Sequence, residues 1–506
     1  MANIIGIDLG TTYSAVAKIN DAGKAEIAPD SLGENITPSV VEFTGKEKYS
    51  VGATAKKMSE VNAKNCVPST PGDEAKRHMG STEKIYEIFG EKHTPVSISA
   101  LILKKLKEDF ENVHGAIDYA VVTVPANFAN EAREATAEAA KLAGLNVENI
   151  INEPTAATFA CSVLSSEELS GKYVIYDFGG GTFDCSIAEV QGQDIEILTS
   201  EGVQKLGGKD VDIALINLVA KRFKEETGKN LNSRFYGILK AEEDKKSLSD
   251  RESILVSIQS PEGIADITIT RDDFEEVISS LVLQAEMAVE VALDRLDLKP
   301  DQLTDIILVG GSTRIPLVKK SITKIFGKEP KLLGNPDEMV ALGAAIYATY
   351  KADGQILNPL QRRSIQKMNI QEVTGQCFGV EIHDAATGGT INSVIINRNE
   401  KIPCSITESL YTIADNQTAV NCHVTSHPEK EEDLTFVRTE WKGKLDLPSG
   451  RPQGQEIKVT YSYTEDQRMR CIFLDVASGN ETSVDLDELR KSADKSTADI
   501  DQFKVE

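Results

Sequence analysis

The sequence lacks most features that mark membrane, secreted and nucleic-acid-binding proteins. Its 506 residues include one Trp and seven Cys, and the formal net charge is −24. The cysteines form neither a CxxC pair nor a His-paired metal spacing, which favours a reducing cytoplasm. No apolar run approaches the roughly 18 residues that a membrane helix needs. The negative charge argues against nucleic acid or an anionic membrane as the main partner.

The N-terminus also lacks the pattern of a secretory leader. Its first ten residues, MANIIGIDLG, contain no basic region and run directly into an apolar strand pattern. We therefore expect a cytoplasmic protein. The length suggests three or four domains, because a single hydrophobic core rarely serves more than about 300 residues.

Residues 1–350 alternate short apolar runs with helical patterns, which predicts an α/β fold. The run 120–125 is typical of a strand, and residues 99–113 have the pattern of an amphipathic helix. Residues 305–320 predict a strand followed by a glycine loop and a helix. Short strands that alternate with helices favour sheets covered by helices.

The Ala-rich segment 130–145 predicts a helix with a signal at each end. Asn130 is the expected N-cap, because its side chain can accept a hydrogen bond from the first turn. Gly144 is expected just beyond the last helical turn, where glycine readily adopts a left-handed backbone.

The pattern changes near residue 350. The polar stretch 355–375 has no clear period, so we interpret it as a linker. From 376 to 485, short alternating runs are separated by turn residues, which predicts an all-β module. The charged stretch 486–506 predicts a weakly helical, frayed tail.

One loop pattern occurs twice, at the ends of two apolar runs. The runs IIGID (4–8) and YVIYD (173–177) have the composition of central strands that are buried on both faces. Each run ends in an Asp that opens a D-x-G segment, with Thr close behind. The residues are Asp8, Gly10, Thr11 and Thr12 in the first copy, and Asp177, Gly179, Gly180, Gly181 and Thr182 in the second.

Such a loop suits a polyphosphate. Glycine lets the backbone approach a ligand closely, and successive N–H groups form a nest for an anion. The Thr hydroxyls add donors, and the two carboxylates can hold hydrated Mg²⁺. One copy alone is more often a structural turn. Two copies 169 positions apart, together with VGGSTR (309–314), indicate a duplicated α/β lobe with a nucleotide between the halves.

At these residues the chain resembles the actin-like ATPase superfamily and, within it, the heat-shock-protein-seventy chaperones of the DnaK type. The order and number of the matching stretches make the resemblance highly specific, and they span nearly all of residues 1–485. They are IIGIDLGTTYS, VVTVPANF, IINEPTAAT, YDFGGGTFD, KLGGKDVD, ILVGGSTRIPLV, NPDEMVALGAA and, in the β-module, ADNQTAV.

The resemblance implies an ATP-dependent chaperone of protein folding and the stress response. Such a protein hydrolyses ATP to ADP and phosphate and binds extended apolar segments of unfolded polypeptides. Its cofactors would be ATP or ADP with Mg²⁺, and K⁺ is a candidate second cation. J-domain co-chaperones and nucleotide-exchange factors are candidate partners. The implied parts are an ATPase domain (1–354) with lobes 1–172 and 173–354, the linker 355–375, a peptide-binding β-sandwich (376–485) and the tail.

Catalytic roles follow from the resemblance by position. Lys76 would lie by the γ-phosphate, and Glu153 and Asp184 would help to order the attacking water and nearby cations. Thr182 would touch the phosphates, while Asp8 and Asp177 would hold the water shell of Mg²⁺. Taken without the family, Lys76 is an ordinary surface lysine and Glu153 an ordinary loop acid.

Nucleotide contacts are implied for a larger set. Four of its members lie at i, i+3, i+4 and i+7 of the segment 241–249, which places them on one helix face; without the family, this would be a solvated charged face. The set is Gly10, Thr11, Thr12, Tyr13, Gly179, Gly180, Gly181, Thr182, Gly208, Glu242, Lys245, Lys246, Ser249, Gly310, Gly311, Ser312, Arg314 and Asp337.

The β-module keeps apolar residues at the positions that line the peptide groove in the family. A groove that takes an extended peptide needs backbone hydrogen bonds and an apolar side-chain pocket. The two residues that usually arch over the peptide are His383 and Ile413 here, which leaves the peptide specificity open. A purely structural role in the core is the alternative. The groove residues are Val380, Leu410, Val420 and Cys422.

Several positions depart from the family pattern. The linker stretch 367–375 lacks the continuous apolar run that drives docking as a strand, so we expect weak docking. Asn149 replaces an Arg that contacts the linker and J-domain proteins, and Asn127 replaces a usual Tyr. About twenty residues follow the β-module, so we expect the helical lid of the family to be missing, either by engineered truncation or naturally. The short segment 79–100 resembles a deletion of bacterial branches, which favours a bacterial source.

Two other functions compete with the chaperone. The first is a nucleotide-binding regulatory or scaffold protein with weakened coupling between its domains, which the polar linker and Asn149 would favour. The second is a small-molecule kinase of the same superfamily. The β-module and the full run INEPTAAT argue against the kinase.

Overall fold

The computed structural model describes residues 2–70, 72–165, 168–331, 333–352, 354–365, 369–384, 388–464, 468–486 and 504–505. The chain forms two compact units that divide between residues 369 and 370, inside the predicted linker. The first unit is an α/β body and the second is all-β, which confirms the predicted fold class. Most of the predicted tail (487–503 and 506) lies outside the described residues.

The first lobe of the α/β unit is built on a mixed sheet with the strand order β11–β10–β1–β2–β3. Strand β1 pairs antiparallel with β2 and parallel with β10, so it lies in the middle and is almost fully buried. The strands are β1 (Ile4–Asp8), β2 (Tyr13–Ile19), β3 (Ala25–Ile27), β10 (Tyr119–Val124) and β11 (Val147–Asn152).

The second lobe repeats this arrangement. Strand β12 pairs antiparallel with β13 and parallel with β17, just as β1 does with β2 and β10. Both predicted central strands therefore hold equivalent places, and both end at an Asp of the repeated motif or one residue beyond it. The strands are β12 (Ser170–Phe178), β13 (Phe183–Gln191), β14 (Asp194–Val203) and β17 (Asp305–Val309).

Two helices cross between the lobes. Helix α4 (Glu153–Leu164) and helix α9 (Met339–Lys351) pack on each other, and α9 also packs on β1, β2 and β10. The crossing is very close, because a Cβ on Gly343 would overlap the backbone carbonyl of Ala156. The contact joins the two halves of the unit through its core.

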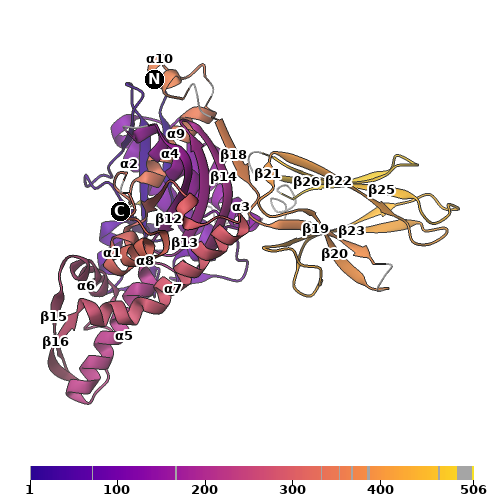
Figure 1. Ribbon diagram of the computed structural model, residues 1–506. Coiled ribbons are helices and arrows are strands. Elements are labelled where there is room, and N and C mark those ends of the chain that lie inside the picture. The colour runs from indigo at the N-terminus through magenta and orange to yellow at the C-terminus, as the bar shows by residue number, and fades with distance from the viewer. Residues whose placement is uncertain are drawn as a thin grey trace. The chain divides into compact units, whose positions relative to one another are not determined.

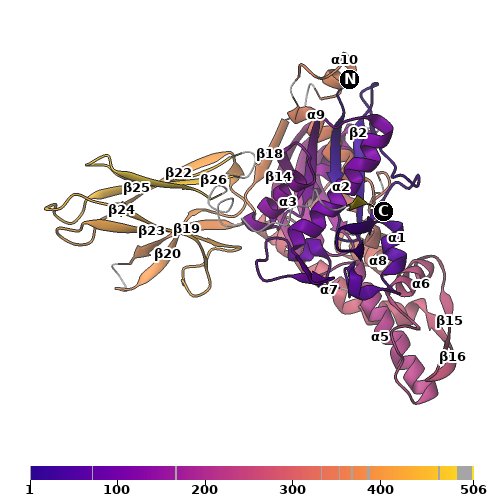
Figure 2. The same ribbon diagram turned by 180° about the vertical axis from the view of Figure 1, so that it is seen from behind.

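Helices α2 (Pro95–His114) and α3 (Asn130–Leu142) cover the first sheet (Figure 2). The predicted cap of α3 is wrong: Ala129 precedes the helix, and Asn130 is its first residue, with its amide bonded to Glu134 at 2.8 Å. The expected end signal is confirmed, because Gly144 has a left-handed φ of 72° one residue beyond the C-cap.

A long extension of the second lobe carries the adjoining helices α5 and α6 and a two-stranded sheet (Figure 1). Helix α7 continues from this sheet back to the lobe core, where it packs on β13 and β14. The elements are α5 (Gly208–Thr227), α6 (Ile238–Asp250), β15 (Ser253–Ser260), β16 (Gly263–Thr270), α7 (Arg271–Arg295) and α8 (Pro316–Phe326).

The remaining elements of the unit are short. A small sheet of the first lobe has the order β28–β6–β5–β7. Its strands and the other short elements are β4 (Thr37–Pro38), β5 (Val41–Gly45), β6 (Lys48–Val51), α1 (Ala53–Met58), β7 (Cys66–Val67), β8 (Tyr86–Ile88), β9 (Glu91–His93), α10 (Pro359–Ile365) and β28 (Lys504–Val505).

The all-β unit is a sandwich of two four-stranded antiparallel sheets, β20–β19–β23–β24 and β22–β25–β26–β27. The Tyr461 hydroxyl donates to the carbonyl of Gly379 at 2.8 Å and ties the sheets together. The eight strands are β19 (Cys377–His383), β20 (Thr390–Ile396), β22 (Cys404–Tyr411), β23 (Ala419–His427), β24 (Arg438–Asp446), β25 (Glu456–Tyr463), β26 (Met469–Asp475) and β27 (Glu481–Asp485). Outside the two sheets, β18 (Asn369–Val373) pairs antiparallel with the short β21 (Lys401–Ile402).

None of the helices in the described ranges is long and apolar enough to span a membrane.

Candidate functional site

The two repeated loops face each other across the α/β unit. The β1–β2 loop of the first lobe brings Thr11 and Thr12 against the glycines of the β12–β13 loop. A Cβ on Gly180 would overlap the Thr12 hydroxyl, and one on Gly181 would overlap the Thr11 side chain. The glycines of the second loop therefore provide the space that the first loop fills.

The first turn of α5 closes the same region from the second lobe. A Cβ on Gly207 would overlap the backbone of Gly180 and Gly181, so only glycine allows this approach. The N–H of Gly208 donates to the carbonyl of Gly179 at 3.0 Å, which fixes the start of the helix to the loop. Backbone of the second lobe is thus packed densely on one side of the cleft.

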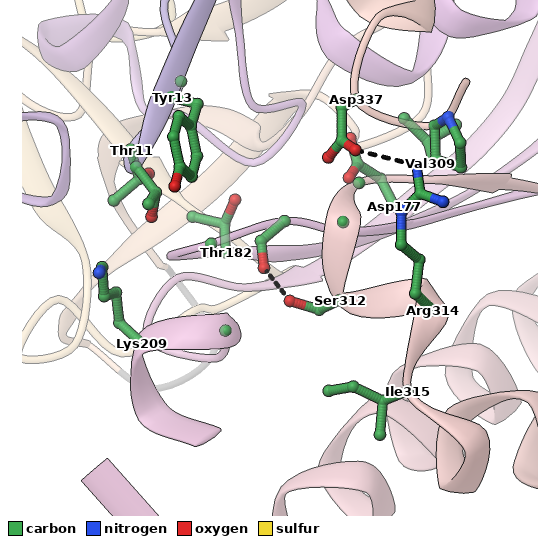
Figure 3. A pocket seen from close by; sticks show the side chains of 18 of the residues that line it. Thr11, Tyr13, Asp177, Thr182, Lys209, Val309, Ser312, Arg314, Ile315 and Asp337 are labelled. Carbon is green, nitrogen blue, oxygen red and sulfur yellow. Dashed lines mark hydrogen bonds and ion pairs between the residues drawn. The ribbon is translucent and has the colours of Figure 1, made fainter. Parts of the chain in front are cut away.

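A cavity of about 800 Å³ opens between these segments (Figure 3). Nearly all of the predicted nucleotide and catalytic residues line it; Gly181 and Asp184 are the exceptions. Those that line it are Asp8, Gly10, Thr11, Thr12, Tyr13, Lys76, Glu153, Asp177, Gly179, Gly180, Thr182, Gly208, Glu242, Lys245, Lys246, Ser249, Gly310, Gly311, Ser312, Arg314 and Asp337.

One end of the cavity is strongly acidic. Lys76 forms an ion pair with Glu153, and both side chains are only 8% exposed. Burial and the Glu153 charge raise the pKa of Asp8 to about 7. Burial, followed by Glu153, also raises the pKa of Asp177 well above its usual value. Burial alone would lower the pKa of Lys76, but Glu153 and Asp8 outweigh it and the pKa is raised.

This acidic end fits a bound cation. Three carboxylates, those of Asp8, Glu153 and Asp177, share the single ammonium group of Lys76 and lack sufficient countercharge. In the described parts of the chain, no three acidic, His or Cys side chains are arranged to hold a metal ion directly. The arrangement therefore suits a hydrated Mg²⁺ better than a directly ligated one. The buried Thr12 hydroxyl has no partner among the described residues and is available to a ligand oxygen.

Asp184 lies behind the cavity wall rather than on it. It is 1% exposed, and burial together with Glu153 raises its pKa to about 8. Its Oδ1 and both polar atoms of the Asn127 carboxamide are buried without a hydrogen bond in the described structure. These polar atoms surround Gly202. A Cβ added to Gly202 would lie 2.7 Å from Asp184 Oδ1 and 2.5 Å from the Asn127 side-chain nitrogen.

The opposite end of the cavity is a network of lysines and acids. The Tyr13 hydroxyl donates to Glu242 Oε1 at 2.7 Å. Lys56 of α1 donates to Glu242 Oε2 at 2.7 Å, so an ion pair joins the two lobes there. Burial would raise the pKa of Glu242, but Lys209 and Lys56 outweigh burial and hold the pKa far below its usual range.

The third wall comes from the β17–α8 loop. Gly310 has φ of 79°, and its Cβ would lie 2.7 Å from Asp177 Oδ1. The Ser312 hydroxyl donates to the carbonyl of Gly179 at 2.8 Å, and Arg314 pairs with Asp337 at 3.0 Å (Figure 3). The β17–α8 loop is therefore held against strand β12 and against the β12–β13 loop.

Several cavity residues were not predicted from the sequence. They include both charged and apolar side chains. They are Ile36, Lys209, Asp212, Asp250, Val309, Ile315, Pro316, Lys319, Pro336 and Val340. The signal that could have found Lys209 and Asp212 is the run GGKDVD, because it opens the helix that faces the cavity.

The four predicted groove residues of the sandwich fall into two classes. Val380 and Cys422 are buried in its hydrophobic core. Leu410 and Val420 are half-buried and pack against that core from its edge. Of the two predicted arch residues, His383 is exposed and Ile413 is 60% exposed. The groove role of all six remains a prediction.

Residues 4–500 match the family model described as Hsp70 protein. The chain is 37% identical over 495 residues to the chaperone protein DnaK of Thermotoga neapolitana, and the match covers 95% of this chain and 80% of that protein. The chaperone protein DnaK of Thermotoga petrophila is similar to the same extent, with 37% identity over 495 residues.

Proposed function

This chain belongs to the Hsp70 family, and from that premise we propose how its residues carry out the family's work. The chain is an ATP-dependent molecular chaperone that hydrolyses ATP and binds unfolded polypeptide. The observation that carries the residue assignment is the pair of facing loops, with the Lys76–Glu153 ion pair at one end of their cavity.

We assign the phosphate end of the cavity to the hydrolysis step. Lys76 would face the γ-phosphate and neutralise the charge that develops there. Glu153 and Asp184 would orient the attacking water; burial raises the pKa of the Asp184 carboxyl to about 8, so a nearby cation or phosphate would affect its protonation. Thr182 would donate to a phosphate oxygen. When bound, Mg²⁺ would add charge neutralisation at the phosphates, with Asp8 and Asp177 holding its water shell.

We assign the rest of the cavity to nucleotide binding. The hydroxyls and N–H groups of both loops, from Gly10 to Tyr13 and from Gly179 to Thr182, would grip the phosphates. Glu242, Lys245, Lys246 and Ser249 of α6 would enclose the ribose, and the set from Gly310 to Arg314, with Asp337, would hold the base. The apolar Val309, Ile315 and Val340 give the base a wall that suits its flat face.

We propose the domain division 1–354, 355–375 and 376–485, because the chain divides between residues 369 and 370. The sandwich would take an extended peptide segment, with Leu410 and Val420 at the rim of the groove. The polar linker would couple peptide binding to hydrolysis weakly, because few apolar side chains drive its docking.

Further proposals concern ions, partners and location. K⁺ is a candidate for the acidic end, which has more carboxylates than lysines.

J-domain co-chaperones and exchange factors are candidate partners, although Asn149 stands where the family has an Arg. The Asn149 side chain accepts a hydrogen bond from Tyr119 at 2.7 Å. A cytoplasmic location follows the family, and the similarity to Thermotoga proteins fits a bacterial source.

Single-turnover ATP hydrolysis tests the proposal. We compare the chain with Lys76→Met and with Lys92→Met, an exposed lysine of the same lobe. Lys76→Met should slow hydrolysis at least about 100-fold, because an unpaired charge at the transition state is costly, while Lys92→Met should hydrolyse normally. Normal hydrolysis by Lys76→Met would overturn the role of Lys76.

The same assay with excess extended apolar peptide tests the coupling. An increase in rate supports communication between the two units. A peptide that binds without changing the rate would overturn coupling and favour a regulatory or scaffold role. Leu410→Asn should weaken peptide binding about tenfold, whereas Leu255→Asn, an exposed position on the ATPase unit, should not change it.

A further inference from the structure

Lys209 is a buried lysine that the nucleotide assignment above does not use. It is the second residue of α5, and its side chain is 8% exposed. It lines the nucleotide cavity and also a smaller pocket of about 60 Å³ beside Thr11, Thr12 and Lys56. Figure 3 shows Lys209 at the start of its helix, on the side of the cavity where Thr11 and Tyr13 lie. The ammonium group is therefore next to space that a ligand can fill.

The partners of Lys209 are distant and already engaged. In the described structure its Nζ has two ion pairs, with Glu242 Oε2 at 3.5 Å and Asp212 Oδ2 at 3.8 Å. Lys245 binds Asp212 more closely, at 2.7 Å. Lys56 and Lys246 bind Glu242 at 2.7 and 2.8 Å. Each acid thus has a closer lysine than Lys209.

The whole cluster therefore carries a surplus of positive charge. Four ammonium groups share two carboxylates, so the cluster holds two more positive than negative charges. A buried cation without a close anion loses more hydration than it regains. An anionic ligand in the adjoining cavity would remove this imbalance, and a phosphate group has the necessary charge and acceptors.

The backbone of Lys209 is fixed to the phosphate loop of the second lobe. Its N–H donates to the carbonyl of Gly180 at 2.9 Å, and Gly208 donates to Gly179 at 3.0 Å. The lysine stem therefore starts at the loop that is proposed to hold the phosphates. Its ammonium group lies 3.5 Å from Glu242, and the residue lines both the nucleotide cavity and the smaller pocket together with Thr11 and Thr12.

From these contacts we propose that Lys209 binds the phosphate chain of the nucleotide as a second lysine, between Lys76 and the ribose site. This rests on the proposed nucleotide site. A phosphate contact made by Lys209 discriminates between nucleotides and the nucleoside, because adenosine presents no anion to it. The lysine would thus contribute to the affinity for ADP and ATP but not to recognition of the adenosine part.

Calorimetric titration with adenosine, AMP and ADP tests this contact in the full chain. Lys209→Met should weaken ADP binding at least about tenfold, as expected for a lost hydrogen bond to a charged group, and should leave adenosine binding unchanged. If Lys209→Met weakens AMP binding as well as ADP binding, Lys209 contacts the α-phosphate. If it weakens ADP binding alone, Lys209 contacts the β-phosphate. Lys221→Met, on the exposed face of the same helix, is the matched control and should bind all three normally.

Two results would overturn the proposal. Equal weakening of adenosine and ADP would mean that Lys209 acts through Glu242 on the ribose end, and unchanged binding of all three would mean that it has no ligand role. Lys209→Arg keeps the charge and should retain ADP binding within about threefold, which provides a second test if Lys209→Met folds poorly. A chain that binds no nucleotide at all would instead overturn the nucleotide site itself.

Discussion

The two repeated loops hold equivalent places in the two lobes, yet one contributes side chains to their contact and the other contributes the space for them. The β1–β2 loop contributes side chains, since Thr11 and Thr12 project toward the other lobe. The β12–β13 loop contributes room, because any side chain on Gly180 or Gly181 would collide with those threonines. A duplicated motif has therefore diverged into two complementary halves rather than two copies of one function.

This complementarity explains why the motif is repeated imperfectly. The strands that lead into the loops keep the same pairing pattern, with one antiparallel and one parallel neighbour. After the shared D-x-G, the first copy continues with Thr-Thr and the second with Gly-Gly-Thr. The second loop needs glycine because the first loop has threonine. Changes at the lobe contact, at each loop and at the cleft mouth should therefore have different effects.

The largest effect on stability is expected where helices α4 and α9 cross. Gly343→Ala would place a methyl group on the carbonyl of Ala156, and the backbone of two core helices would have to separate. Overpacking of this kind should lower the free energy of unfolding by about 3 kcal/mol or more. Thermal denaturation measures the loss. Gly45→Ala, where the added methyl has only ordinary contacts, should have little effect.

Gly181→Ala should be the next most damaging change. The methyl group would push Thr11 out of the second loop and move both loops apart. A displacement of about 1 Å at a positioned ligand can cost about 100-fold, so ADP affinity should fall by that order. Adding Thr11→Gly to Gly181→Ala removes the obstacle and should restore part of the affinity. No recovery in the double variant would contradict the complementary packing of the loops.

Thr12→Val should weaken ADP binding about tenfold or more. The Thr12 hydroxyl is buried and has no partner in the described structure, so it is free to donate to a phosphate oxygen. Without nucleotide, the variant should be at least as stable as the wild type, since an unpaired buried hydroxyl is replaced by a methyl group. Titration calorimetry and thermal denaturation measure the two quantities. A Thr12→Val variant that is less stable but binds ADP with unchanged affinity would contradict a phosphate-binding role for the Thr12 hydroxyl.

The smallest effect on nucleotide binding is expected at the Lys56–Glu242 ion pair. Lys56→Met removes the largely buried ion pair that joins the first lobe to Glu242, but Lys209 and Lys246 still pair with Glu242. ADP release should become only a few-fold faster, because Glu242 keeps two other lysine partners. Stopped-flow displacement of a fluorescent nucleotide measures the rate. The exposed neighbour Lys57→Met should release ADP at the wild-type rate.

The sequence predicted the parts of the site that lie on continuous motifs. The loops and the 241–249 helix face line the cavity, because each is contiguous in the chain or follows a helical period, whereas Lys76 was assigned only through the family resemblance. Lys209 was missed, although the run GGKDVD opens the helix that faces the cavity. Asp184 belongs to the same motif as Asp177 and is its cross-strand partner, yet it is 1% exposed and does not line the cavity, which the motif alone does not predict.

The sandwich was harder to predict in detail. Its strands alternate as expected, but alternation alone does not distinguish an inward residue of the core from one that lines a groove at its edge. Val380 and Cys422 are fully enclosed by the core, whereas Leu410 and Val420 are at its margin. A similar limit applies at Asn130, where the helix begins one residue earlier than the capping preference suggested.

Hydrogen exchange of the loop amides tests the central claim most directly. The exchange of residues 9–13 and 178–183 would be measured with and without saturating ADP and Mg²⁺. A nucleotide gripped from both lobes should slow exchange in both loops to a similar degree. Saturated binding that protects only one loop, or neither, would contradict the account.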